Sequence, residues 1–388
     1  MGWRNATIVA VALTLVGAAC STDKPAGSPD GDGKKSATYT VQVDSHKPAS
    51  EFGTYFSKFF PGEVKVRAGD SIDFKLNWSG EPHSVTFGTL VDAGAEKLDP
   101  TSREEPAEWQ KIPLMLPEGP GDAVQAGINP CYVETGDPPK EDLCENRTQP
   151  KTFTGTYSMH SSGFLPEGST YRVTFDSAID AGTYSYFCTL HRGVMVGKVT
   201  VVAATETVPS PDEVATQADT EIDAIRTKLA GAYDKSKQGM GPGSILAGTG
   251  DPTLIEGGTD AGVTEFLPAK AIAKVGETVK FLPVGPHTVS FNTPQDAVES
   301  LVKAGDGTWH INPKAFGPTG SPPSGPPGEK PVVTDAGTWN GEGFLNSGIL
   351  LGFGPPGALT WQVKFGKAGT YEFRCLLHPD MEGSITVA

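Results

Sequence analysis

An internal repeat constrains the fold of this chain more than any other feature of its sequence. Four blocks of similar residues occur in the same order in both halves of the chain. Self-similarity of this kind is the sequence signature of repeated structural units, and it predicts two tandem domains of one fold. The matching blocks are residues 59–74 with 266–281, 82–87 with 286–291, 162–165 with 347–350, and 181–191 with 368–378.

The content of the first block favours strands. In both copies a run of apolar and β-branched residues leads to a turn made by glycine and an acidic residue, and a second run follows; the turns are Gly69-Asp70 and Gly276-Glu277. The chain contains 48 Gly and 33 Pro among its 388 residues, so turn-forming residues are frequent throughout. Short runs separated by dense turns are typical of sandwiches and barrels. We therefore expect an all-β protein.

The region between the two copies has the features of a helix. Ser210-Pro211-Asp212-Glu213 is a capping box with proline at the first helical position, and apolar residues follow at helical spacing. We expect residues 51–204 and 251–388 to form the two domains, with residues 205–250 as a short helical linker.

The first 20 residues have the features of an export signal. Arg4 precedes an apolar run that is too short to span a bilayer and that ends at Cys20. Residues 16–20 resemble a bacterial lipobox, in which the cysteine is lipidated and becomes the mature N-terminus. We expect a signal peptide and lipobox over residues 1–20, a flexible tether over residues 21–50, and a lipoprotein at the cell surface, on the outer face of the cytoplasmic membrane. The alternative is an ordinary cleaved signal peptide, which would leave a secreted or periplasmic protein.

The charge of the chain restricts its partners. With 31 basic and 46 acidic residues, the formal net charge is −15. This balance disfavours nucleic acid as a partner, because binding to phosphates requires a basic surface. It suits an exported protein that docks on a basic partner.

The five cysteines separate into three groups. Cys20 belongs to the lipidation motif. In an exported chain, Cys131 and Cys144 are expected to form a disulfide that closes a loop in the first domain. Cys188 and Cys375 remain single, and an unpaired cysteine in an exported domain requires another explanation.

Each single cysteine lies in a short motif with a histidine and a methionine, and one further histidine precedes it in the same domain after a proline. Soft thiolate and thioether ligands favour Cu(I), while imidazole also suits Cu(II). Zinc prefers four strong ligands without a thioether, and iron–sulfur clusters need more thiolates. The pattern therefore selects copper. The candidate ligands are His83, Cys188, His191 and Met195 in the first domain, and His287, Cys375, His378 and Met381 in the second.

These motifs resemble the cupredoxin, or type 1 blue-copper, family, which includes plastocyanin-, amicyanin- and pseudoazurin-like proteins. The resemblance covers residues about 51–204 and 251–388. It implies two Greek-key β-sandwich domains, each with one type 1 copper bound by the four ligands named above. The residue after the first histidine is often Asn in the family and is here Ser84 or Thr288, which can still donate a hydrogen bond.

The remaining histidines argue against catalysis. Enzymes built from tandem cupredoxin domains, such as nitrite reductases and multicopper oxidases, need a second kind of copper held by additional histidines, often in His-x-His pairs. This sequence has no His-x-His pair, and outside the two motifs it has only His46, His160 and His310, for which we expect surface or structural roles. We expect an electron carrier that acts with a redox protein. Copper storage or delivery is the alternative, and a copper enzyme ranks third.

The loops next to the two histidines carry opposite charges. Arg192 follows His191, whereas Asp380 lies two residues after His378. Because a positive charge disfavours Cu(II), the sequence predicts a higher reduction potential for the first site.

Overall fold

The computed structural model describes most of the chain after residue 35. Five predicted features lie outside the described residues: the signal peptide, Cys20, His46, Cys131 and Cys144. The described ranges are 36–45, 51–77, 80–99, 105–112, 152–238, 240–256, 260–303, 309–319, 332–352 and 356–388.

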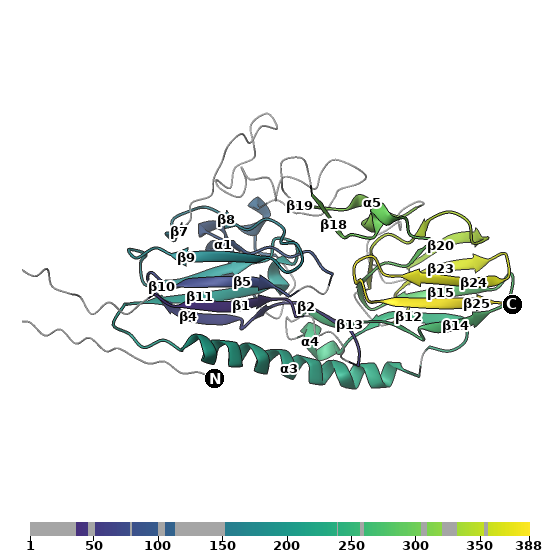
Figure 1. Cartoon of the computed structure of the whole chain (residues 1–388), viewed down its shortest axis with the longest axis horizontal. Helices are drawn as coiled ribbons and strands as arrows, with labels where there is room; N and C mark the ends of the chain where they lie inside the picture. Colours follow the sequence, from purple (N-terminus) through teal and green to yellow (C-terminus); the bar gives the residue numbers. More distant parts are fainter. Residues whose placement is uncertain are drawn as a thin grey trace, which may run out of the picture. The chain divides into compact units, whose positions relative to one another are not determined.

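The first half of the chain forms a sandwich of two five-stranded sheets (Figure 1). Neighbouring strands in these sheets are mostly not neighbours in the sequence, as in Greek-key sandwiches. One sheet has the order β3 (Phe59–Phe60), β1 (Thr38–Val43), β5 (Ser71–Leu76), β9 (Thr170–Phe175) and β7 (Thr152–Phe153); the other has the order β4 (Glu63–Arg67), β11 (Val196–Val202), β10 (Gly182–Phe187), β6 (Thr86–Phe87) and β8 (His160–Ser161).

Strand β1 corrects the prediction that residues 21–50 are a flexible tether. It pairs in parallel with β5 along its whole length, from Thr38 opposite Ser71 to Val43 opposite Leu76. Tyr39, Val41 and Val43 are buried, and the residues between them are not. This period of two is the signal of a half-buried strand, so the tether prediction is wrong for residues 38–43.

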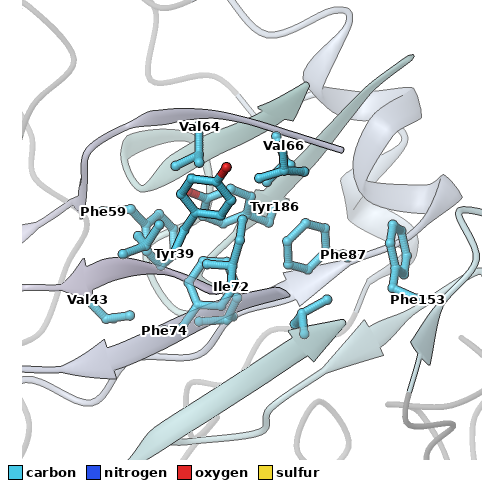
Figure 2. Close-up of a cluster of buried hydrophobic side chains, with 14 of the residues drawn as sticks. Tyr39, Val43, Phe59, Val64, Val66, Ile72, Phe74, Phe87, Phe153 and Tyr186 are labelled. Carbon is cyan, nitrogen blue, oxygen red and sulfur yellow. The ribbon is translucent and has the colours of Figure 1, made fainter. Parts of the chain in front are cut away.

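Aromatic rings fill the core of the first sandwich. Tyr186 lies with its ring centroid 4.8 Å from that of Phe59, 5.0 Å from Phe74 and 4.9 Å from Phe87. Figure 2 shows these side chains together with Tyr39 and the valines of β4. Large buried rings of this kind contribute much of the apolar area that a sandwich of this size removes from water.

The second half repeats the sandwich with one six-stranded and one five-stranded sheet. Two small sheets accompany it: β16 (Gly285–His287) with β22 (Leu350–Gly352), and β18 (Leu301–Lys303) with β19 (Trp309–Ile311). The larger sheet has the order β2 (Thr54–Ser57), β13 (Asp260–Leu267), β12 (Ser244–Thr249), β15 (Thr278–Pro283), β23 (Leu359–Phe365) and β20 (Val332–Trp339); the other has the order β14 (Lys270–Ala273), β25 (Glu382–Val387), β24 (Gly369–Arg374), β17 (Ser290–Phe291) and β21 (Leu345–Asn346).

Strand β2 crosses the expected boundary between the halves. Its residues belong to the first half by sequence, yet it pairs with β13 of the second, with Thr54 opposite Val263 and Ser57 opposite Asp260 (Figure 1). Residues 36–388 form one compact unit. The two sandwiches predicted by the repeat are therefore present, and a strand from residues 51–204 completes a sheet of the second.

The predicted helix between the halves is confirmed and is longer than a short linker. Helix α3 (Pro211–Ser236) begins with the capping box, in which Ser210 and Glu213 bond each other's backbone N–H. Its apolar side packs on residues of both halves, among them Phe56, Phe60 and Val263. Among the described residues, no helix is both long and apolar enough to cross a membrane. The remaining helices are α1 (Thr89–Ala95), α4 (Pro252–Glu256), α5 (Pro313–Phe316) and the 3-10 turns Trp109–Lys111, Arg192–Val194 and Gln295–Ala297.

Candidate metal centres

Each single cysteine begins a tight turn at the end of an antiparallel strand. Cys188 follows β10, and its backbone N–H donates to the carbonyl of Met195, 3.0 Å away, just before β11. Cys375 follows β24, and its N–H donates to the carbonyl of Met381 at 2.9 Å. The strand pair thus closes the loop and brings the cysteine, the histidine and the methionine of each motif to one end of a sandwich.

The earlier histidine of each half reaches the same place through a short strand contact. His83 forms a bridge with Leu165, and His287 in β16 lies opposite Leu350 in β22. Leu165 and Leu350 are themselves equivalent in the repeat, so the two halves position this histidine in the same way.

The structure brings the predicted histidine and cysteine ligands together in both halves. The ligand atoms of His83, Cys188 and His191 all lie within 4.8 Å of one another, and so do those of His287, Cys375 and His378. Among the described residues, these two groups are the only ones with such a spacing. Each group has two imidazoles and one sulfur, as the sequence predicted.

The donor atoms fit a metal ion. The Nδ1 atoms of His83, His191 and His287 are buried and have no hydrogen-bond partner among the described residues. The Nδ1 atom of His378 faces the Sγ atom of Cys375 at 3.6 Å. A buried polar atom without a partner is costly, and a metal ion is one way to satisfy it. Two imidazoles with one thiolate are the strong ligands that copper favours.

The surroundings of both cysteines favour the thiolate form of the side chain. Burial acts to raise the pKa of Cys188 and of Cys375, but the neighbouring histidines outweigh it and hold both pKa values well below the ordinary range. The backbone N–H groups of Ser84 and Thr288 point to the two sulfurs at 3.4 and 3.3 Å. The side-chain hydroxyls of the same two residues, for which the sequence predicted a hydrogen bond, lie 3.9 and 3.8 Å from the sulfurs.

Both methionines are fully buried beside their cysteines. Met195 belongs to the same apolar cluster as Cys188, and Met381 belongs to the same cluster as Cys375. Their role as axial ligands stays a prediction.

A carboxylate supports the first histidine of the first site. The Oδ2 atom of Asp44 lies 3.3 Å from Nε2 of His83, and its Oδ1 atom accepts hydrogen bonds from the backbone N–H of Ser45 and Phe56. Burial acts to lower the pKa of His83, yet Asp44 and Cys188 raise it to about 10. Such outer partners orient a ligand and increase its basicity.

The second site lacks this carboxylate. Nε2 of His287 instead lies 3.1 Å from the backbone carbonyl of Val284, and burial lowers the pKa of the imidazole. Val41 lies opposite Phe74, and Ile245 lies opposite Phe281, its match in the repeat, so the position equivalent to Asp44 is Gly248. A Cβ added at Gly248 would lie 2.1 Å from Nε2 of His287. The first histidines of the two sites therefore differ in their surroundings although their motifs match.

Glu81 lies between the two sites. Its side chain is buried; Oε2 is 3.6 Å from Nε2 of His191, and Oε1 is 3.7 Å from Nε2 of His378. Burial acts to raise the pKa of Glu81, but His378 and His191 outweigh it and lower the pKa. The equivalent position in the second half is Gly285.

Tyr55 brings the first half of the chain to the second site. It lies on β2, and its ring stacks on that of His378 with a centroid distance of 5.4 Å and an angle of 22°. The Tyr55 ring also meets His287 edge-on at 6.3 Å. Asp44, Glu81 and Tyr55 could not be identified from the sequence, since none has an acidic or aromatic counterpart in the repeat that would single it out.

The other predicted residues lie apart from these groups or outside the described residues. His160 is buried among the rings of Phe153, Tyr157 and Tyr171, and burial lowers its pKa to about 4. This agrees with the structural role expected for it. His310 lies in β19, opposite Val302. Cys188 and Cys375 are free among the described cysteines.

Comparison with known proteins gives a family match for the first half. Residues 54–202 match the model of copper binding proteins of the plastocyanin/azurin family. Among solved structures, the chain is similar to reduced auracyanin from Roseiflexus castenholzii (20% identity, 44% of this chain and 99% of that chain, TM-score 0.23). It is also similar to auracyanin A from Chloroflexus aurantiacus (19% identity, 42% and 98%, TM-score 0.21) and to a Cu(I) form of an amicyanin variant (16% identity, 42% and 82%, TM-score 0.20). With TM-scores this low, the assignment rests on the family match and on the donor geometry.

Proposed function

Because this chain belongs, through residues 54–202, to the plastocyanin/azurin family of copper-binding proteins, we propose that it is an electron carrier with two type 1 copper sites. The observation that carries the proposal is the pair of buried His–Cys–His groups with unpartnered imidazole nitrogens. His83, Cys188, His191 and Met195 would hold one copper, and His287, Cys375, His378 and Met381 the other. Copper in such a ligand set supplies reversible one-electron chemistry.

The residues around each site serve electron transfer by holding the ligands still. The cysteine turn is closed by backbone hydrogen bonds, the sulfur receives an N–H, and both ligand loops pack in a sandwich core. A ligand set that moves little between the two copper oxidation states keeps the reorganisation cost of electron transfer low. His378 is only 1% exposed, and its burial excludes water from the second site.

Catalysis has less support than electron transfer. A catalytic copper needs several histidines beyond the type 1 ligands, and the sequence contains no His-x-His pair. Of the other histidines, His160 is buried among aromatic rings of the first sandwich.

Copper delivery is the competing role, because it would use the same ligands. The deep burial of both cysteines disfavours rapid handover of the metal. A reversible one-electron reduction with copper retained against a chelator would support electron transfer. Rapid loss of copper to the chelator would support delivery, and turnover of nitrite or of phenols with oxygen would support an enzyme.

We further propose that Cys20 carries a lipid and tethers the protein to a membrane, where it exchanges electrons with a redox protein. The acidic net charge disfavours nucleic acid as a partner. The wild-type protein should partition into detergent, and the Cys20→Ala variant should lose this behaviour or fail to be processed. Equal solubility of the two mature forms would contradict the anchor.

A further inference from the structure

We propose that Glu81 is a positioning residue shared by both metal centres. Its carboxylate couples the two sites, so that an electron moves from one to the other within the molecule. This inference rests on the proposed function. A carboxylate that supports one ligating histidine is a common arrangement. Here a single carboxylate faces one ligating histidine from each of two sites.

The geometry assigns one oxygen to each site. Oε2 of Glu81 faces Nε2 of His191 at 3.6 Å, and Oε1 faces Nε2 of His378 at 3.7 Å. A movement of about 0.7 Å would give N–H···O bonds of ordinary length on both sides. In both histidines the facing atom is Nε2, which leaves Nδ1 for the metal.

Among the described residues, Glu81 forms ion pairs only with His191 and His378. Both of its oxygens are buried and lack a hydrogen-bond partner among the described residues. An ionised carboxylate removed from water is costly unless it is paired with a charge or with strong donors. The two imidazoles supply those donors when each carries its proton on Nε2, and the same proton position frees each Nδ1 for copper.

The backbone before Glu81 lies against the loop of the second site. Gly80 has a φ of 114°, and a Cβ there would lie 1.8 Å from the carbonyl oxygen of Leu377. The carbonyl of Gly80 also accepts a hydrogen bond from the Ser300 hydroxyl at 3.1 Å. Glycine thus permits this segment to lie directly against the loop that carries His378.

The same segment ends in a ligand of the first site. Within four residues the chain contacts the second site through Gly80, faces both sites through Glu81, and contributes His83 to the first. The two ligand sets are therefore connected by a short, buried path. It follows the backbone from His83 to Glu81 and continues through the polar contacts of the Glu81 carboxylate.

This arrangement predicts one-electron exchange between the centres. With copper held by both ligand sets, a reduced first site would give one electron to an oxidised second site, which would leave Cu(II) at the first and Cu(I) at the second. No bond forms or breaks, and no external reagent is consumed. Because Asp44 increases the basicity of His83 and thereby favours Cu(II) at the first site, the electron should reside mainly on the second.

The first test uses the metal-free protein. Glu81→Gln keeps the size of the side chain and removes its charge, and Asp44→Asn is the matched control because Asp44 faces a candidate ligand of the first site, His83. With 15N-labelled histidine, the Nε2 signals of His191 and His378 should both shift in Glu81→Gln, whereas the control should shift His83 alone. A change at one or neither of His191 and His378 would overturn the shared position. If Glu81→Gln does not fold, Glu81→Asp, which is too short to reach both rings, should give the same double shift.

The second test uses the copper-loaded protein. Copper affinity should fall by about 10–100-fold at both sites in Glu81→Gln and at the first site alone in the control. After injection of one electron into the fully oxidised protein, redistribution between the sites should be several-fold slower in Glu81→Gln than in the control. Equal redistribution rates in the two variants would contradict the coupling. Absence of type 1 absorption in the wild type would overturn the proposed function, while the metal-free test would still decide the position of Glu81.

Discussion

Asp44 and Gly248 occupy equivalent positions in the two halves of the protein, and they give the first histidine of each site a different partner. Asp44 places a carboxylate oxygen 3.3 Å from Nε2 of His83. At Gly248 there is no side chain, and Nε2 of His287 faces the carbonyl of Val284 at 3.1 Å. Two sites with the same ligand types therefore differ in the negative charge next to an imidazole, and this difference should separate their reduction potentials.

The Asp44→Asn variant tests this difference. Losing the carboxylate should weaken Cu(II) binding at the first site more than Cu(I) binding, so the reduction potential of that site should rise. For a one-electron couple, each tenfold loss of Cu(II) over Cu(I) affinity raises the potential by about 59 mV. Spectroelectrochemistry should resolve this rise with no change at the second site. A fall in potential, or an equal shift at both sites, would contradict the role of Asp44.

The surroundings of Arg192 oppose the sequence-based expectation that this residue raises the reduction potential of the first site. The structure places the Arg192 guanidinium in an ion pair with Glu105 and in hydrogen bonds to the carbonyls of Trp109 and Ile112. Its charge is therefore compensated locally. Asp44, which the sequence did not single out, places a carboxylate directly against a ligand, so we now expect the lower potential at the first site.

Gly248→Ala should damage the second site selectively. The added Cβ would lie 2.1 Å from Nε2 of His287, and the φ of 81° disfavours any side chain. We expect displacement of His287, loss of the second site's visible band, and destabilisation of at least about 1–3 kcal/mol from the backbone alone.

Gly276→Ala is the matched control for this substitution. Gly276 has a φ of 86°, but its Cβ would have only the end of Lys364 at 4.0 Å. This variant should lose stability and keep both bands. Identical spectra for the Gly248→Ala variant and the wild type would show that His287 does not lie where the structure places it.

His160 should make stability depend on pH in a defined window. Burial lowers its pKa to about 4, against an ordinary value of 6.5, so the unfolded state binds the proton more readily than the folded state. Its contribution therefore falls as pH decreases from about 6.5 to about 4, by at most about 1.4 kcal/mol per pH unit. In His160→Phe, denaturant unfolding should show a weaker loss of stability across this window. Parallel pH profiles for the two proteins would contradict the burial of a neutral imidazole.

The start of α3 should contribute measurably to stability. Ser210 accepts a hydrogen bond from Glu213 N–H, and the Glu213 carboxylate accepts one from Ser210 N–H. Ser210→Ala should lower the free energy of unfolding by about 1 kcal/mol. Thr216→Ala, at an exposed position inside the same helix, should leave it nearly unchanged or raise it slightly, because alanine is the better helix former. An equal loss of unfolding free energy in the two variants would argue against the capping box.

The two His–Cys–His groups could be predicted because they depend largely on local spacing. Cys188 and His191, like Cys375 and His378, lie on one turn, and the repeat supplied the distant histidines. Strand β1 also has a sequence signal, an alternation of apolar residues that begins at Tyr39 and that the structure buries. It lies before the first repeated block, so the repeat does not reveal it.

Glu81, Asp44 and Tyr55 could not be predicted because their roles depend on long-range pairing. Tyr55 reaches His378 only because β2 pairs with β13, more than 200 residues later in the chain. Glu81 acquires its two partners only where the loop of His378 lies against Gly80. No local pattern encodes such contacts, and the second half has glycine where the first has Asp44 and Glu81.

The most direct test of the whole account is the copper content and visible spectrum of three cysteine variants. Thiolate-to-copper charge transfer produces the colour of a type 1 site, and serine lacks the soft sulfur. The wild-type chain should bind two coppers, Cys188→Ser and Cys375→Ser should each lose one band and one type 1 EPR signal, and the double variant should be colourless. A single copper in the fully loaded wild type, with one of the two single variants spectroscopically unchanged, would contradict the account.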